Sequence, residues 1–102
     1  MTDLYTCGTW TVIPGREDDF VEAWTEFAEW TSASMPAAGW ATLLQDQETP
    51  NRFLTVGPWE SLEAVGEWRA SEGFQERIGR IREILVGFEP GLFRRRAGIG
   101  TG

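Results

Sequence analysis

The residues of this sequence that could carry acid–base or nucleophilic chemistry are few. Its 102 residues include neither histidine nor lysine. These absences exclude Ser-His-Asp triads, Cys-His dyads, Schiff-base lysines and histidine-ligated metals or haem. Proton transfer would therefore fall to carboxylates, to Tyr5, to Cys7 or to a substrate that ionises by itself.

Residues 56–74, VGPWESLEAVGEWRASEGF, hold the most distinctive candidates. Trp59 and Trp68 lie nine residues apart, and each leads toward a serine. Trp59 follows Pro58 at an expected strand–helix corner, where a large aromatic ring can plug a core or wall a binding site. Both interpretations stay open for Trp59, and packing on the buried side of a helix is the simpler interpretation for Trp68.

Cysteine usage and charge exclude further classes of function. The single cysteine, Cys7, cannot form a disulfide framework, and no Cys/His cluster is available for zinc, so we expect a structural thiol and no metal site. The net charge is −7, with nine acidic residues and one arginine in residues 1–51. Such an acidic chain repels nucleic-acid phosphates, so we expect no nucleic-acid partner.

The sequence also lacks membrane and secretion signals. No apolar run approaches the roughly 18 residues of a membrane-spanning helix, so no membrane partner is expected. The N-terminus, MTDLYTCGTW, has no basic region followed by an apolar segment. We therefore expect a cytoplasmic location.

Hydrophobic periodicity and turn residues predict seven elements. The expected elements are a strand at 4–13, a helix at 16–33, strands at 40–46 and 52–57, helices at 61–70 and 71–86, and a strand at 91–97. Ser61 and Ser71 are the expected N-caps, Pro58 the expected strand end and Gly87 the expected helix stop. Residues 98–102 are expected to be a disordered tail.

The order β-α-β-β-α-α-β predicts an α+β, ferredoxin-like split βαβ domain over residues 1–97. Helices would cover one face of a four-stranded antiparallel sheet. The strands are also apolar on the other face, which a monomer would leave exposed to water. We therefore expect a homodimer in which two sheets pack face to face.

Three segments carry a resemblance to a known family: VIPGREDDFVEAW, RFLTVGPWES and WRASEGFQERI. The second contains a Trp-x-Ser element, which begins at Trp59, and the third a W-x-x-S-x-x-F element from Trp68 to Phe74. At these places in this topology, the chain resembles the antibiotic biosynthesis monooxygenase family, over roughly residues 5–97. The resemblance implies a dimeric α+β barrel.

The resemblance further implies oxidation of an aromatic polyketide or quinol by O2 without flavin, haem or metal. Trp59 matches a tryptophan implicated in catalysis in some members. Polar positions that those members use on the preceding strand and second helix are here Thr55 and Val65, in place of the usual Asn and Tyr. We expect the other substrate contacts to line a pocket between helices and sheet: Trp10, Phe27, Trp68, Phe74 and Ile78.

Haem-degrading monooxygenases of the same superfamily look similar around Trp68. In them a histidine follows that tryptophan by ten residues, and here Ile78 stands there. Their strand-one asparagine falls at about Gly8. We therefore expect no haem partner.

Three functions remain open for this fold. They are a cofactor-free oxygenase, a binding module without chemistry, and a polyketide cyclase or isomerase. Each needs a shaped pocket, and six tryptophans and six phenylalanines favour a flat, apolar, aromatic ligand in every case.

Overall fold

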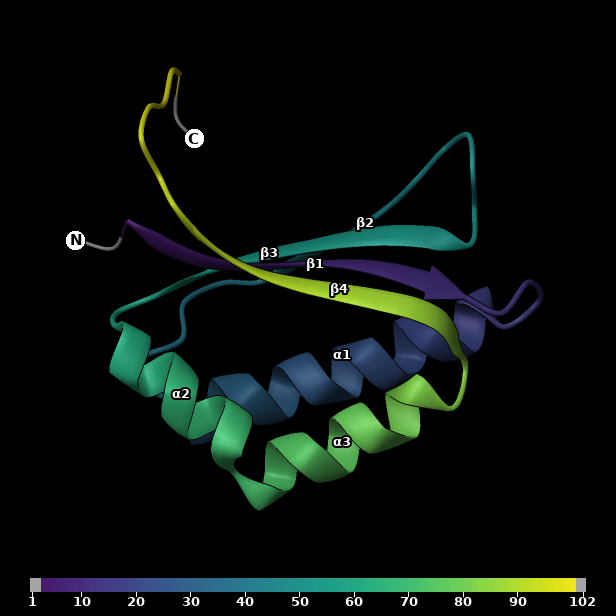
Figure 1. Cartoon of the computed structure of the whole chain (residues 1–102), viewed down its shortest axis with the longest axis horizontal. Coiled ribbons are helices and arrows are strands. Elements are labelled where there is room, and N and C mark those ends of the chain that lie inside the picture. The colour runs from purple at the N-terminus through teal and green to yellow at the C-terminus, as the bar shows by residue number, and fades with distance from the viewer. Residues whose placement is uncertain (1–2, 101–102) are drawn as a thin grey trace.

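A computed structural model describes residues 3–100, which form four strands and three helices. The elements in chain order are β1 (Leu4–Val12), α1 (Glu17–Ser34), β2 (Thr42–Gln45), β3 (Arg52–Trp59), α2 (Leu62–Ala70), α3 (Glu72–Arg82) and β4 (Leu85–Arg94). The strands make one antiparallel sheet in the order β2-β3-β1-β4. All three helices cover the same face of this sheet (Figure 1). The ferredoxin-like α+β arrangement expected from the sequence is therefore confirmed.

Each helix begins where the sequence supplies a cap or negative charge. Three acidic residues occupy the first turn of α1, where the helix dipole favours anions. The Ala64 N–H donates to Ser61 Oγ at 3.1 Å, and the Phe74 N–H donates to Ser71 Oγ at 3.2 Å. Both predicted serine caps are thus confirmed, and the second one separates α2 from α3.

The core lies between the helices and the sheet. Phe20 on α1 and Phe53 on β3 are almost fully buried, and their ring centroids lie 4.8 Å apart. Trp10 on β1 stacks on Phe88 of β4 with 4.0 Å between centroids. The remaining buried members of this cluster are Val12, Phe27, Ile78, Ile81 and Ile84.

The prediction that Pro58 ends its strand is wrong, because β3 continues to Trp59. The Pro58 carbonyl accepts a hydrogen bond from the Gly39 N–H at 2.9 Å, on the side away from β1. Since the N–H and C=O of one strand residue point to the same side, the N–H that proline lacks would also have faced away from β1. No bond of the β1–β3 ladder is lost, so proline is tolerated.

The predicted end of the last helix and start of the last strand are also wrong. The helix α3 ends at Arg82, and β4 begins at Leu85 instead of residue 91. Gly87, the expected helix stop, lies inside β4 opposite Thr11. The apolar residues after Arg82 continue a helical pattern, but pairing along the edge of β1 overrides that pattern. A bulge between Thr11 and Val12 adjusts the register.

The sheet face opposite the helices carries exposed apolar side chains. Leu44, Leu54 and Phe93 on this face are 53%, 44% and 58% exposed. Trp40 precedes β2, and its ring centroid lies 6.3 Å from that of Tyr5. This apolar face is accordingly the one that a partner would cover.

Residues 95–99 form no regular secondary structure, and residues 101–102 of the expected tail lie outside the described residues. No helix within residues 3–100 is long and apolar enough to cross a membrane.

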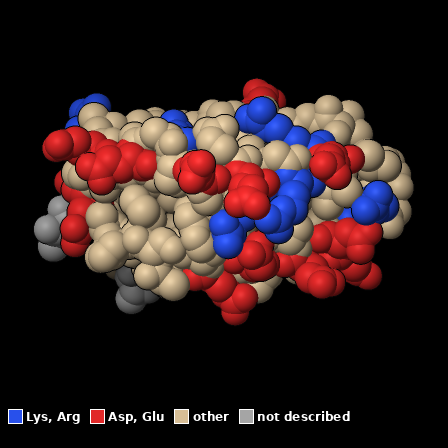
Figure 2. Space-filling view, turned by 90° about the horizontal axis from the view of Figure 1, so that it is seen from below, with Lys and Arg blue, Asp and Glu red and all other residues tan. Residues whose placement is uncertain are grey.

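The outer surface of the helical layer is strongly charged. Viewed from the helix side, arginines form a band that is bordered by acidic residues (Figure 2). Two of the contributing ion pairs are Arg80 with Glu76 at 3.2 Å and Arg77 with Glu26 at 3.4 Å. The second pair joins α3 to α1.

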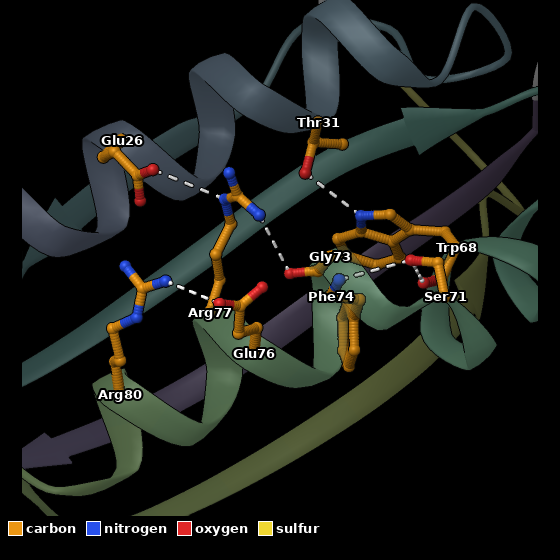
Figure 3. A network of polar contacts seen from close by, with 9 residues as sticks. All are labelled: Glu26, Thr31, Trp68, Ser71, Gly73, Phe74, Glu76, Arg77 and Arg80. Carbon is orange, nitrogen blue, oxygen red and sulfur yellow. Dashed lines mark hydrogen bonds and ion pairs between the residues drawn. The ribbon is translucent and has the colours of Figure 1, made fainter.

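The same α1–α3 junction depends on a glycine. A Cβ atom at Gly73 would overlap the ring of Trp30. The Arg77 guanidinium lies 4.4 Å from the centroid of that ring, and Arg77 Nη1 donates to the Gly73 carbonyl at 3.2 Å (Figure 3). The Trp30 ring is therefore packed between the backbone of Gly73, which has no side chain, and the Arg77 guanidinium.

We predict that Gly73→Ala lowers the free energy of unfolding. Overpacking against Trp30 costs about 1–3 kcal/mol, which outweighs the gain in helix propensity of about 1 kcal/mol or less. The measurement is urea denaturation at one fixed protein concentration.

Gly79→Ala is the matched control, because Gly79 lies in the same helix and a Cβ atom there meets nothing within 4 Å. We expect this variant to gain about 0.5–1 kcal/mol. Equal unfolding midpoints for the two variants would show that the Trp30 contact does not constrain Gly73.

Candidate functional site

A cavity of about 560 Å³ lies between the sheet and the helices. Its lining comes from β1, β3, β4, all three helices and the segment 38–41 that precedes β2. The volume is in the range of small-molecule sites, roughly 300–1,000 Å³. The helix-facing side of the two central strands therefore forms the floor of a ligand-sized space.

The structure brings seven of the eight predicted site residues to this cavity. They are Trp10, Phe27, Thr55, Trp59, Trp68, Phe74 and Ile78. Val65 is buried in α2 but is not among the lining residues. The role of Val65 as a substrate contact rests on the family resemblance alone.

Aromatic rings make up much of the wall. The ring centroid of Trp68 lies 4.7 Å from that of Trp59 and 5.6 Å from that of Phe27. On the other side of the floor, Trp10 stacks on Phe88. Such surfaces suit a flat, apolar ligand by stacking and by burial of area.

Three of the tryptophans that line the cavity each donate a hydrogen bond from the indole N–H to a threonine hydroxyl. The pairs are Trp10 Nε1 with Thr55 Oγ1 at 3.0 Å, Trp59 Nε1 with Thr6 Oγ1 at 3.2 Å, and Trp68 Nε1 with Thr31 Oγ1 at 3.0 Å (the last is drawn in Figure 3). An indole only donates, whereas a hydroxyl that accepts such a bond keeps its own proton to donate elsewhere.

Thr31 and Thr55 both keep a hydroxyl proton for a ligand, and of these two Thr55 is the one on a strand of the cavity floor. Thr6 already directs its hydroxyl toward the Gly57 carbonyl at 3.5 Å. Within residues 3–100, Thr55 makes no hydrogen bond through its side chain other than the one from Trp10. Its hydroxyl proton is thus available at the cavity floor.

Gly8 makes room for the Trp10–Thr55 pair. A Cβ atom at Gly8 would lie 2.9 Å from Thr55 Oγ1, 3.0 Å from Trp10 Nε1 and 3.2 Å from the Phe88 ring. Gly8 faces Thr55 directly in the β1–β3 register. Any larger residue at position 8 would therefore displace the hydroxyl or the indole.

Charged groups line the cavity only at its margins. Within the described chain they are Glu29 and Arg82, which are exposed, and Arg69, which is half-buried. The interior surface accordingly has no carboxylate that could act as a base. No three His, Cys, Asp or Glu side chains between residues 3 and 100 group closely enough to hold a metal ion.

The side chains of the other two candidates for proton transfer, Tyr5 and Cys7, point away from the helices. Side chains alternate along a strand, so Tyr5 and Cys7 leave β1 on the opposite face from Thr6 and Gly8. Burial raises the pKa of the Cys7 thiol, which keeps it neutral at ordinary pH. Cys7 is among the lining residues, but the alternation directs its thiol to the other face of the sheet, and Tyr5 does not line the cavity.

Sequence reasoning missed several lining residues. Period-two alternation along β1 puts positions 6, 8 and 10 on one face, and this signal could have identified Thr6 and Gly8 together with Trp10. Thr31 lies on the apolar stripe expected for the first helix, which is a weaker signal. Phe88 lies outside the predicted last strand, which begins at residue 91, whereas β4 begins at Leu85.

The family model for antibiotic biosynthesis monooxygenases matches residues 5–80. The comparison with curated proteins found no match. Among solved structures, SnoaB, a cofactor-independent oxygenase from Streptomyces nogalater, is 21% identical with a TM-score of 0.87, and the match covers 97% of this chain and 98% of that chain.

Two further structures extend the likeness to other organisms. A conserved protein from Methanosarcina mazei Go1 is 16% identical with a TM-score of 0.82, over 94% of this chain and 95% of that one. A candidate monooxygenase from Bordetella bronchiseptica is 21% identical with a TM-score of 0.81, over 97% and 100%. These likenesses show the shared fold. Because the family model spans most of the sequence, the chain belongs to the antibiotic biosynthesis monooxygenase family.

Proposed function

We propose that the protein is a cofactor-independent monooxygenase that oxidises an electron-rich aromatic substrate of the phenol, quinol or anthrone type with O2. The observation that carries this proposal is the composition of the cavity. Aromatic walls surround an available hydroxyl donor on the cavity floor, that of Thr55, and no internal base. Such a site suits a substrate that ionises by itself and needs to be oriented and shielded from water.

The bound substrate lies against the rings of Trp59, Trp68 and Phe27. Its anionic oxygen accepts a hydrogen bond from the Thr55 hydroxyl, which Trp10 holds in place from behind. A hydrogen bond to a charged acceptor is stronger than one between neutral groups. Thr55 therefore favours the ionised form of the substrate, which is the form that reduces O2.

The reaction balances without a further reductant. For an anthrone, a ring CH2 group and O2 become a ring carbonyl and water. Loss of a proton gives a carbanion, which passes an electron to O2, and the two radicals combine to a peroxide. The peroxide takes up the proton that the substrate lost, and loss of water then leaves the carbonyl. One oxygen atom enters the product, the other leaves as water, and all electrons come from the substrate.

We predict that Thr55→Val reduces kcat for oxygen uptake with an anthrone by about 10- to 100-fold, the range expected when a hydrogen bond to a charged oxygen is lost. Valine keeps the shape of threonine and removes the donor. The measurement is oxygen consumption with an oxygen electrode after chelator treatment of the protein.

Thr49→Val is the control, because Thr49 lies in the exposed β2–β3 turn and does not line the cavity. Trp59→Phe, which removes the N–H bonded to Thr6, should also slow uptake. An unchanged rate in Thr55→Val would remove the hydroxyl from the mechanism. If the wild-type protein binds the anthrone without oxygen uptake, it is a binding module.

The dependence of activity on pH supplies a second prediction. Because no group inside the cavity accepts the proton, kcat/KM should rise with pH through the ionisation of the substrate itself. Two substrates with different pKa values should then give midpoints that differ by the same amount. A midpoint common to both substrates would instead identify a titrating group of the protein.

We also infer that two copies associate through the sheet face opposite the helices. The support is the exposed apolar surface of Leu44, Leu54, Phe93 and the neighbouring Trp40. A face-to-face pair would remove this surface from water under two-fold symmetry. The dimer completes the barrel expected from the sequence.

We predict that Leu54→Arg converts this dimer into a monomer, because a charge buried between two apolar sheets is costly without a partner. Light scattering at micromolar concentration measures the mass. Leu62→Arg is the matched control, since Leu62 is 59% exposed at the start of α2 and far from that face. A wild-type protein that is already monomeric under these conditions would contradict the dimer.

A further inference from the structure

Some arginines of the helices have a carboxylate partner within the protein and others have none. Arg77 and Arg80 each have a carboxylate partner, Glu26 and Glu76 respectively. Arg69 and Arg82 both line the cavity and have no ion pair within the described chain, and of the two only Arg82 also lines the adjoining hollow beside β4. We propose that Arg82 binds a carboxylate carried by the aromatic ligand, an inference that rests on the proposed use of the cavity.

The chain does not lack acids that could neutralise Arg82. It contains 16 acidic residues and only nine arginines. Two more arginines, Arg16 and Arg52, are also paired with acidic residues. In this excess of negative charge, a cavity arginine without a carboxylate partner leaves a binding position for an acidic group from outside the protein.

The position of Arg82 on α3 directs it to the cavity. Gln75, Ile78 and Arg82 lie on one stripe of the helix, with spacings of three and four residues, and all three line the cavity. Arg80 lies in the same last turn but off this stripe, and it pairs with Glu76. Both arginines suit the negative end of the helix dipole, so the dipole does not explain why Arg82 lines the cavity and Arg80 does not.

A smaller hollow adjoins the cavity at this point. It measures about 260 Å³ and is lined by Arg82 and residues 85–88 at the start of β4. Arg82 and Phe88 belong to the linings of both spaces. A ring stacked near Phe88 can therefore extend a short acidic substituent toward the guanidinium.

The guanidinium is well matched to a carboxylate. Its planar donors can bind both oxygen atoms at once, which fixes direction as well as adding energy. The one acidic lining residue within the described chain, Glu29, lies on α1 rather than on α3. The carboxylate of the ligand is attracted to Arg82 and repelled by Glu29. These two effects together select one orientation of the ligand beside the Thr55 hydroxyl.

The test compares anthracene-2-carboxylate with its methyl ester by isothermal titration calorimetry on the full chain. We expect the wild-type protein to bind the acid at least about tenfold more tightly than the ester at low ionic strength. Arg82→Gln should abolish that preference and leave the affinity for the ester unchanged. Arg80→Gln, the control from the same helical turn, should retain the preference.

Two results would overturn the proposal. The first is equal affinity of the wild-type protein for acid and ester, including no measurable binding of either. The second is a preference that survives Arg82→Gln, with Arg69→Gln tested in parallel to locate the group responsible. The assay needs no oxygen, so a protein that prefers the acid through Arg82 but consumes no O2 would refute only the oxygenase activity.

Discussion

A buried indole N–H must find an acceptor, and this requirement organises the centre of the molecule. Leaving one unpaired costs about 1–3 kcal/mol. Two of the three pairs are reciprocal, since Trp10 of β1 donates to Thr55 of β3, and Trp59 of β3 donates to Thr6 of β1. The same bonds that satisfy the tryptophans therefore fix the hydroxyl groups on the cavity floor.

Much of the fold could be predicted from local signals in the sequence. Apolar periodicity located the first strand and helix, and Ser61 and Ser71 marked the break between α2 and α3. The start of β4 could not be predicted in this way, because the residues up to Leu85 continue the apolar stripe of the helix. Only the unpaired edge of β1, a tertiary feature, decides that they form a strand.

Some features of the candidate site could likewise be predicted from local sequence patterns, and others depend on the tertiary structure. Its aromatic walls follow from stripe positions such as Phe27 and Ile78, which periodicity reveals. Its polar atoms depend on long-range register, because Thr55 meets Trp10 across 45 residues and only when Gly8 stands opposite. The orientation of Arg82 requires both the phase of α3 and the place of β4, so no local pattern could identify it.

The order of the strands places the hydroxyl groups of the cavity floor on the central strands and the margins of the cavity beside the edge strands. The hydroxyls of Thr6 and Thr55 belong to β1 and β3, the central strands, which are hydrogen-bonded on both sides. The margins of the cavity are formed beside β2 and β4, the edge strands, and β2 is only four residues long. Local opening takes least free energy where backbone bonds are few and exposed, so amide exchange should be fastest at β2. A bulky ligand can therefore enter through fluctuations of the rim while the geometry of the floor is preserved.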